Sequence, residues 1–182
     1  MKTQSLKSQQ LKLIHFAIYL GLGFIMLTSL KCKKENLNVL PPATMSGENT
    51  MGAYIDGKLF VSRRTDLLSQ DPGVTYTPAI HELGFGGRSI LVDDGPILGF
   101  LITQNLRIGR INLEKDGLDN GLLTIRSVSG NLVRYYTESG YLEFTRFDIN
   151  SKVFSGTFDA IFKSESGQTI HVTDGRFDLK AK

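Results

Sequence analysis

Turn-forming residues interrupt short apolar runs at close intervals after residue 51, and this spacing constrains the fold more than any other feature of the chain. The clearest turn is Asp56-Gly57, because both residues tolerate the positive φ that a two-residue hairpin loop requires. It predicts a hairpin over residues 53–61, whereas the polar residues 62–78 predict a long loop. Further strands are expected over residues 79–85, 89–93, 97–103, 106–113, 122–128 and 132–137.

The last 30 residues show the two-residue period of a β-strand most clearly. One face of the expected strand over residues 152–163 carries Phe154, Gly156, Phe158, Ala160 and Phe162. In the final strand the inward residues change from even numbers (Ile170, Val172) to odd numbers (Phe177, Leu179), so we expect a β-bulge at Asp174-Gly175. Together these patterns favour an all-β fold, an antiparallel β-sandwich, with an open or closed small β-barrel as the alternative.

The first 31 residues have the order of a secretory signal. Residues 1–12 contain lysines and no acidic residue, residues 13–30 are almost entirely apolar, and Cys32 follows closely. A cysteine at this position accepts diacylglycerol in bacterial lipoproteins, so we predict that Cys32 joins the chain to membrane lipid. Lys31 stands where a small residue usually precedes the cysteine. The alternative is therefore an uncleaved signal anchor in the inner membrane.

The remainder of the chain divides into a predicted flexible linker over residues 32–50 and a single domain over residues 51–182. Pro41-Pro42 and the turn-forming residues after it are typical of a linker. Four of the 21 basic residues precede Cys32 and no acidic residue does, which leaves 17 basic against 18 acidic residues in the rest of the chain. A nearly neutral domain argues against a nucleic-acid partner, because nucleic-acid binding needs a basic face.

Two stretches of the sequence resemble one family. Residues 40–60 read LPPATMSGENTMGAYIDGKLF, and residues 154–180 read FSGTFDAIFKSESGQTIHVTDGRFDLK. They are similar to the opening and the close of a family of uncharacterised Bacteroidota envelope lipoproteins, in which a Ser or Gly usually precedes the lipid-bearing cysteine. The resemblance implies a location in the cell envelope, at the periplasmic or surface face of the outer membrane, and carries no catalytic residue to this chain.

The sequence predicts neither a metal site nor a cofactor. Cys32 is the single cysteine, and only His81 and His171 follow it. His81 is expected on a strand, partly buried on the same face as Leu83 and Phe85, and His171 is expected at an exposed strand position. Two histidines without a domain cysteine do not make a transition-metal site.

Glycine-rich and acidic loops are interpreted as turns. Residues 84–89 lack the following helix that a phosphate loop needs. Residues 93–95 and 116–121 contain oxygen ligands that calcium accepts, but Asp, Asn and Gly are also the residues that tight turns require.

Catalytic signatures are missing, and the chain is not expected to be an enzyme. It contains no Gly-x-Ser-x-Gly elbow. The carboxylate pairs that an envelope hydrolase would use are Glu82 with Glu143 or Asp148 with Asp159. We regard this hydrolase as the least favoured of the three functions.

Three tyrosines form the candidate ligand surface. Tyr135, Tyr136 and Tyr141 flank a predicted turn, where their rings could stack on a sugar, but packing in the core or the hairpin is the favoured interpretation. The leading hypothesis is a membrane-anchored, non-enzymatic binding or structural module with a glycan or an envelope protein as partner. The alternative is a carbohydrate- or small-ligand-binding lipoprotein of an uptake system.

Overall fold

The computed structural model describes residues 38–63, 72–91, 94–104, 106–115, 117–126 and 130–182. The predicted signal segment and Cys32 lie outside these residues. Ten strands and one 3-10 helix, η1 (Pro78–Ile80), make up the described part. The strands are β1 (Thr50–Ile55), β2 (Lys58–Arg63), β3 (Gly73–Thr77), β4 (Glu82–Arg88), β5 (Ile97–Ile102), β6 (Gly109–Glu114), β7 (Asn120–Arg126), β8 (Leu132–Asp148), β9 (Val153–Ser164) and β10 (Thr169–Lys180).

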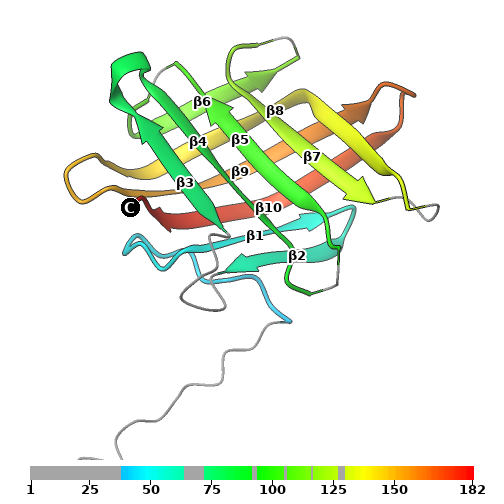
Figure 1. Cartoon of the computed structure of the whole chain (residues 1–182), viewed down its shortest axis with the longest axis horizontal. Coiled ribbons are helices and arrows are strands. Elements are labelled where there is room, and N and C mark those ends of the chain that lie inside the picture. Colours follow the sequence, from blue (N-terminus) through cyan, green and yellow to red (C-terminus); the bar gives the residue numbers. More distant parts are fainter. Residues whose placement is uncertain (1–37, 64–71, 92–93, 105, 116, 127–129) are drawn as a thin grey trace, which may run out of the picture. The chain divides into compact units, whose positions relative to one another are not determined.

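All ten strands belong to one antiparallel sheet in the order β2-β1-β10-β9-β8-β7-β5-β4-β3, with β6 paired to β8. The 17-residue β8 pairs with β9 along one edge and with both β7 and β6 along the other. The sheet curls into a half-barrel, so that β3, β4, β5 and β7 cross over β8, β9 and β10 (Figure 1). The expected all-β fold is confirmed. Its two facing layers are parts of one continuous sheet rather than separate sheets.

Phenylalanine rings fill the space between the two layers. Phe85 of β4 lies 4.5 Å from Phe177 of β10, and Phe100 of β5 lies 4.8 Å from Phe158 of β9, measured between ring centroids. Such pairs add about 0.5–1.5 kcal/mol each beyond the burial of their surface. The alternation predicted for β9 is confirmed, since its five inward residues, including Phe154, are all buried.

Several local predictions are confirmed by the backbone. Asp56 and Gly57 have φ values of 46° and 74° and join β1 to β2. The expected bulge in β10 is present as a register shift between Val172 and Gly175. Here Gly175 lies opposite Phe158, and a Cβ atom on this glycine would come within 2.3 Å of the Phe158 ring. The extra residue therefore turns the side chains that follow it back toward the core, and the glycine leaves room for an aromatic ring.

Four predicted elements need correction. β4 ends at Arg88, and the described residues 89–91 of the strand expected over residues 89–93 do not form a strand. Pro78 begins η1 instead of a strand over residues 79–85, because proline pre-sets the helical φ at a first turn. The long loop expected over residues 62–78 contains β3. The run over residues 132–137 does not end in a turn, because bulges near Thr137 and Phe144 let β8 continue along β9.

The described part of the predicted linker is bound to the domain. The Asp178 carboxylate of β10 accepts hydrogen bonds from the Thr44 hydroxyl at 2.6 Å and from the Gly47 backbone N–H at 2.8 Å. Ser155 of β9 donates to the same carboxylate at 2.6 Å. The backbone N–H groups of Ser46 and Glu48 complete the set. The folded unit therefore begins well before residue 51, and the two stretches that carry the resemblance meet at this carboxylate.

This hydrogen-bonded loop, residues 44–48, changes the acidity of the group that it surrounds. Burial raises the pKa of the Asp178 carboxyl, but the hydrogen bonds from Ser155, Thr44 and the backbone lower it by more. The net pKa lies below the ordinary value of 3.8. Asp178 is therefore ionised at neutral pH, and its charge holds the N-terminal segment on the sheet.

A candidate binding cleft at the open edge of the sheet

A cleft of about 880 Å³ lies at the edge of the sheet that β3 forms. It is formed by β3, β4 and β5 on one side and by the β8–β9 turn and the C-terminal residues on the other. Its lining residues are Asn49, Pro72, Gly73, Val74, Thr75, Tyr76, Pro78, Gly84, Phe85, Gly86, Gly87, Ile97, Leu98, Gly99, Ile149, Lys152, Phe154, Lys180, Ala181 and Lys182. This volume falls within the range of small-molecule and cofactor sites.

The cleft follows the backbone of β3. Residues 72–76 all contribute to its lining. Because consecutive strand residues point to opposite faces of a sheet, a cleft that touches all of them runs along the edge of the strand. Across the outer face, Gly73, Gly86 and Gly99 stand in register on three neighbouring strands. Without side chains at these positions, the sheet backbone itself is exposed to the cleft.

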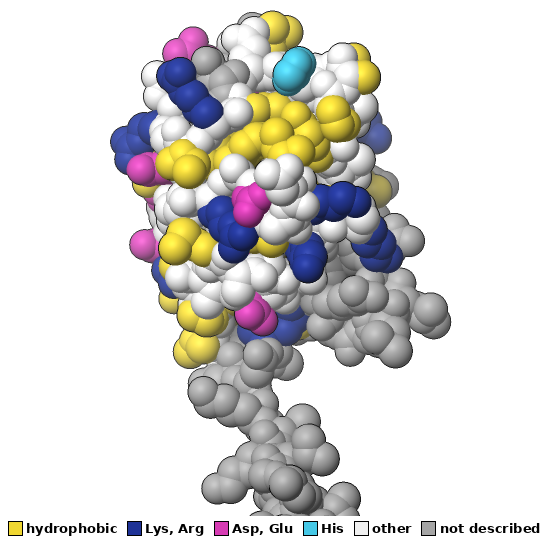
Figure 2. Space-filling view, turned by 90° about the vertical axis from the view of Figure 1, so that its left-hand side faces the viewer, with side chains coloured by type: hydrophobic (Ala, Val, Ile, Leu, Met, Phe, Trp, Pro, Cys, Tyr) yellow, Lys and Arg dark blue, Asp and Glu magenta, His cyan; other side chains and the backbone are white. Residues whose placement is uncertain are grey.

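Aromatic and aliphatic side chains form one wall of the cleft. The Tyr76 ring lies 5.9 Å from the Phe154 ring and 6.1 Å from Phe147, so β3 is packed against the β8–β9 turn. Ile149 adds an exposed apolar side chain beside them. Figure 2 views this end of the molecule and shows a band of hydrophobic side chains, with Lys and Arg side chains gathered below it.

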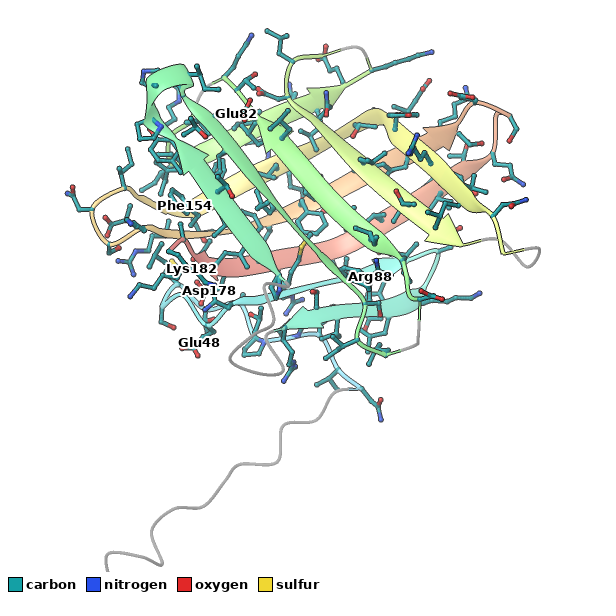
Figure 3. The ribbon with its side chains drawn as sticks, in the orientation of Figure 1. Glu48, Glu82, Arg88, Phe154, Asp178 and Lys182 are labelled. Carbon is teal, nitrogen blue, oxygen red and sulfur yellow. The ribbon has the colours of Figure 1, made fainter. Side chains whose placement is uncertain are left out.

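Three lysines form the rim of the cleft. The Lys152 Nζ atom donates to the main-chain oxygen of Lys182 at 2.8 Å, and Lys180 lies two residues before Lys182 in the chain. Within the described ranges, no acidic side chain forms an ion pair with any of the three. Figure 3 shows Lys182 on the same side of the molecule as Phe154. The rim is therefore cationic, and the wall behind it is apolar.

Two acidic groups on the neighbouring strands, Asp148 and Asp178, are engaged within the protein. Asp148 pairs with Arg146 at 2.8 Å and accepts the backbone N–H of Ser151 at 3.0 Å. The hydrogen bond from Arg146 has the largest effect and those from Ser151 the next largest, and together they lower the pKa of the Asp148 carboxyl far below its usual range. Asp178 is enclosed by the 44–48 loop.

Comparisons of the chain with protein-family models, with curated proteins and with solved structures found no match. The site must therefore be interpreted from its own geometry. Among the described residues there is no helix with the length and hydropathy that a membrane span requires. In the same ranges, no cluster of three or more His, Cys, Asp or Glu side chains is arranged to hold a metal ion.

The three predicted tyrosines do not form one surface. Tyr135 is 7% exposed and faces the core, where its hydroxyl donates to Gln168 at 3.1 Å. Its neighbour Tyr136 points to the opposite face and is 47% exposed. Tyr141 lies five residues further along β8 than Tyr136, roughly 16 Å away at 3.3 Å per residue. The strand geometry that separates them follows from the absence of the predicted turn.

Tyr136 instead lines a second, smaller cleft of about 460 Å³. The other lining residues are Leu132, Val133, Arg134, Ser164, Glu165 and Ser166. An exposed aromatic ring beside an arginine, a glutamate and hydroxyl groups is an arrangement that suits a sugar, which needs both stacking and hydrogen bonds.

Tyr141 belongs to a surface network on β6, β8 and β9. Its hydroxyl donates a short hydrogen bond to Asp159, and the Arg110 guanidinium lies 3.9 Å from the centre of its ring. Arg110 also pairs with Glu143 at 3.3 Å. The hydrogen bond to Asp159, together with burial, raises the pKa of the Tyr141 hydroxyl. The network gives these side chains structural partners and leaves Tyr141 little free ring surface.

The proposed carboxylate pairs are not brought together by these contacts. Glu143 is engaged by Arg110, and Asp159 also accepts the backbone N–H of Asp174 at 3.0 Å. Asp148 lies opposite Val153 on β9, six residues from Asp159, which corresponds to roughly 20 Å. A glycosidase pair needs a separation of roughly 5–10 Å. Glu82 lies on β4 and Glu143 on β8, and β5 and β7 stand between these strands in the sheet.

The remaining candidate positions have mostly structural surroundings. His81 is exposed in a left-handed conformation (φ 50°) after η1, so its predicted place on a strand face was wrong. His171 is exposed on β10, as predicted. Asp93 and Asp116 of the candidate calcium loops lie outside the described residues. Asp119 of the second loop accepts the backbone N–H groups of Thr103 and Gln104 at 2.6 and 2.9 Å, which supports the turn interpretation.

Sequence reasoning missed the β3 cleft. Its lysines are visible at positions 152, 180 and 182, but nothing local indicates that they meet β3. The available signal was the short segment between Pro72 and Pro78, which contains three β-branched residues and a tyrosine and therefore suits a short strand.

Proposed function

We propose that this protein is a membrane-tethered, non-enzymatic binding module that holds its ligand in the β3 cleft. One observation carries the proposal: the cleft combines apolar surface, at the half-buried Tyr76 and the exposed Ile149, with a rim of three lysines that have no acidic partner among the described residues. Apolar contact supplies most of the binding free energy in such sites, and a few charged groups fix the orientation of the ligand. The expected ligand therefore has an apolar part and a negative charge.

The tether is supported by the sequence. Four features support a domain outside the inner leaflet: the basic start, the apolar segment, Cys32 and the resemblance to Bacteroidota envelope lipoproteins. The 44–48 loop attached to Asp178 is consistent with this arrangement, because it ties the chain that follows Cys32 firmly to the sheet.

The binding site is tested with a probe of matching chemistry. Naphthalene-1,5-disulfonate, an aromatic dianion, is titrated calorimetrically into the full-length protein in phosphatidylcholine nanodiscs. We expect saturable binding at one site. Changing Lys152, Lys180 and Lys182 to Glu should weaken binding at least tenfold, about 1.4 kcal/mol, because a negatively charged rim repels the anionic probe.

A matched variant separates local charge from net charge. Lys58→Glu, Arg107→Glu and Lys115→Glu change exposed residues that do not line the cleft and alter the net charge by the same amount. The affinity of this variant for the probe should stay within about threefold of the affinity of the unmodified protein, because salt screens the effect of distant charges. Equal losses in both variants, or no saturable binding at all, would contradict the β3 cleft as the binding site.

A second candidate function is carbohydrate binding in the Tyr136 cleft. The observation that favours it is the exposed Tyr136 ring beside Arg134 and Glu165. The variant Tyr136→Ala discriminates between the two clefts in the same titration. It should leave the disulfonate affinity unchanged. If it abolishes binding while the rim variant does not, the second cleft is the site.

The tether is tested independently by Cys32→Ser. We expect the unmodified protein in the membrane fraction, with an intact mass equal to residues 32–182 plus fatty chains. The Cys32→Ser variant should lose the added lipid mass, because the thiolate is the acceptor of the lipid. Unmodified protein at full-length mass without lipid would instead establish an uncleaved signal anchor.

A further inference from the structure

We propose that the ligand of the β3 cleft is an extended acidic peptide segment of a partner protein, which adds to the sheet as a strand beside β3. The inference rests on the proposed function because it uses the same cleft, and it names the class of ligand. Three features of the described residues lead to it: the open edge of β3, the prolines at its ends and the charge of the rim.

The edge of β3 offers backbone hydrogen bonds. β3 pairs with β4 through residues Gly73–Thr77 and is the last strand of the sheet, so its other edge pairs with no strand of the described part. In an antiparallel pair, alternate residues direct their N–H and C=O groups away from the neighbouring strand. These groups line the cleft and form a template for an added strand.

Two prolines delimit the template. Pro72 immediately precedes β3, and Pro78 immediately follows it. Proline has no backbone N–H and cannot extend a strand ladder, so pairing is restricted to about five residues. A short edge of this kind resists sheet-to-sheet aggregation but still accepts one short segment. The expected ligand therefore contributes a strand of about five residues.

The walls of the cleft fix the side chains of the added strand. Side chains of a strand alternate between two faces. One face of the added strand would meet the apolar wall at Tyr76 and Ile149, and the other would leave the cleft near the rim. The lysines at positions 152, 180 and 182 have no acidic partner within the described part of the chain. Alternating apolar and acidic residues match this surface.

A peptide fits these observations better than a compact molecule does. The cleft contacts consecutive backbone positions from residue 72 to 76 and continues over glycine backbone at Gly86 and Gly99. Exposed main chain along a strand recognises another main chain, and it offers few contacts to a rounded ligand. The apolar wall and the charged rim then set which sequences bind.

The test starts from a random heptapeptide display library, selected against the full-length protein in phosphatidylcholine nanodiscs. Parallel selections use the rim variant (Lys152→Glu, Lys180→Glu, Lys182→Glu) and the charge-matched variant (Lys58→Glu, Arg107→Glu, Lys115→Glu). Thermal melting by circular dichroism verifies that both variants fold. We expect peptides with alternating apolar and acidic residues to be enriched on the unmodified protein and the charge-matched variant, but not on the rim variant.

Backbone methylation of the best peptide then tests strand addition directly. N-methyl groups are placed on all odd residues in one peptide and on all even residues in another. One set removes the N–H groups that face β3 and should weaken binding at least tenfold, whereas the other set should be tolerated. Hydrogen exchange of the β3 amides that face away from β4 should slow when the unmethylated peptide binds.

The outcomes separate this inference from the proposed function. Any of three results would overturn strand addition. These are that the unmodified protein enriches no peptides beyond those found with the rim variant, that the two methylated peptides bind equally well, or that the protein self-associates through β3 instead of binding a peptide. If the naphthalene disulfonate still binds at the rim, the cleft remains a binding site and only the peptide is excluded. Loss of both kinds of binding would remove the proposed function as well.

Discussion

Replacing Asp178 with alanine is expected to lower the free energy of unfolding by about 3–5 kcal/mol. The carboxylate is 1% exposed and accepts five hydrogen bonds, two of them from Thr44 and Ser155. Each buried donor left without an acceptor costs about 1–3 kcal/mol, and the 44–48 loop would recover only part of this by exposure to water. Urea unfolding followed by circular dichroism measures the change.

The variant Asp178→Asn isolates the charge. Its amide keeps one acceptor oxygen, so we expect a smaller loss than for alanine. The folded-state pKa of Asp178 is below 3.8, so ionisation stabilises the fold above this pH, and the contribution is lost as the pH falls through the folded-state pKa. The asparagine variant should therefore lose less stability than the unmodified protein during acidification below 3.8. Identical acid profiles would contradict an ionised, hydrogen-bonded Asp178.

Phe158→Ala should be similarly damaging, with an expected loss of about 3–5 kcal/mol. The Phe158 side chain is fully buried, packs against Phe100 at 4.8 Å and lies against the backbone at Gly175. Alanine would leave a cavity between the two layers of the sheet that the surrounding strands cannot fill. The same urea titration measures the effect.

Two further variants control the Phe158 experiment. Phe158→Leu keeps much of the volume and should cost about half as much or less. Thr157→Ala changes the neighbouring residue on the opposite face of β9 and should cost less than about 1 kcal/mol. A Phe158→Ala protein that unfolds at the same urea concentration as Thr157→Ala would show that this ring does not join the two layers.

The Asp178 contacts also connect stability to the candidate site. Asn49 follows the bound loop, and its side-chain oxygen accepts the backbone N–H of Lys180 at 3.0 Å. Ala181 donates to the backbone oxygen of Lys152 at 2.9 Å. The rim lysines therefore stand on backbone that is ordered by these hydrogen bonds, and loss of Asp178 should loosen the rim as well as the fold.

The sequence by itself determined the local features of the fold. Alternation in β9, the Asp56-Gly57 turn and the change of parity near Gly175 each depend on neighbouring residues alone. Strand period, turn conformation and bulge position are properties of a few adjacent residues, so they can be predicted without knowing the partner strands. The N-terminal signal and the lipid at Cys32 remain predictions of the same local kind.

Only the tertiary structure decided the site, because the site depends on contacts between residues distant in sequence. Lys180 meets β3 only because β10 and β3 lie close together in the curled sheet. One bulge near Thr137 lets β8 run on past the predicted turn and leaves Tyr136 and Tyr141 far apart on it. The residues that follow Pro41-Pro42 bind Asp178 more than 130 positions away. A charge or an aromatic ring acquires its role from the strand placed beside it, and no local pattern specifies that strand.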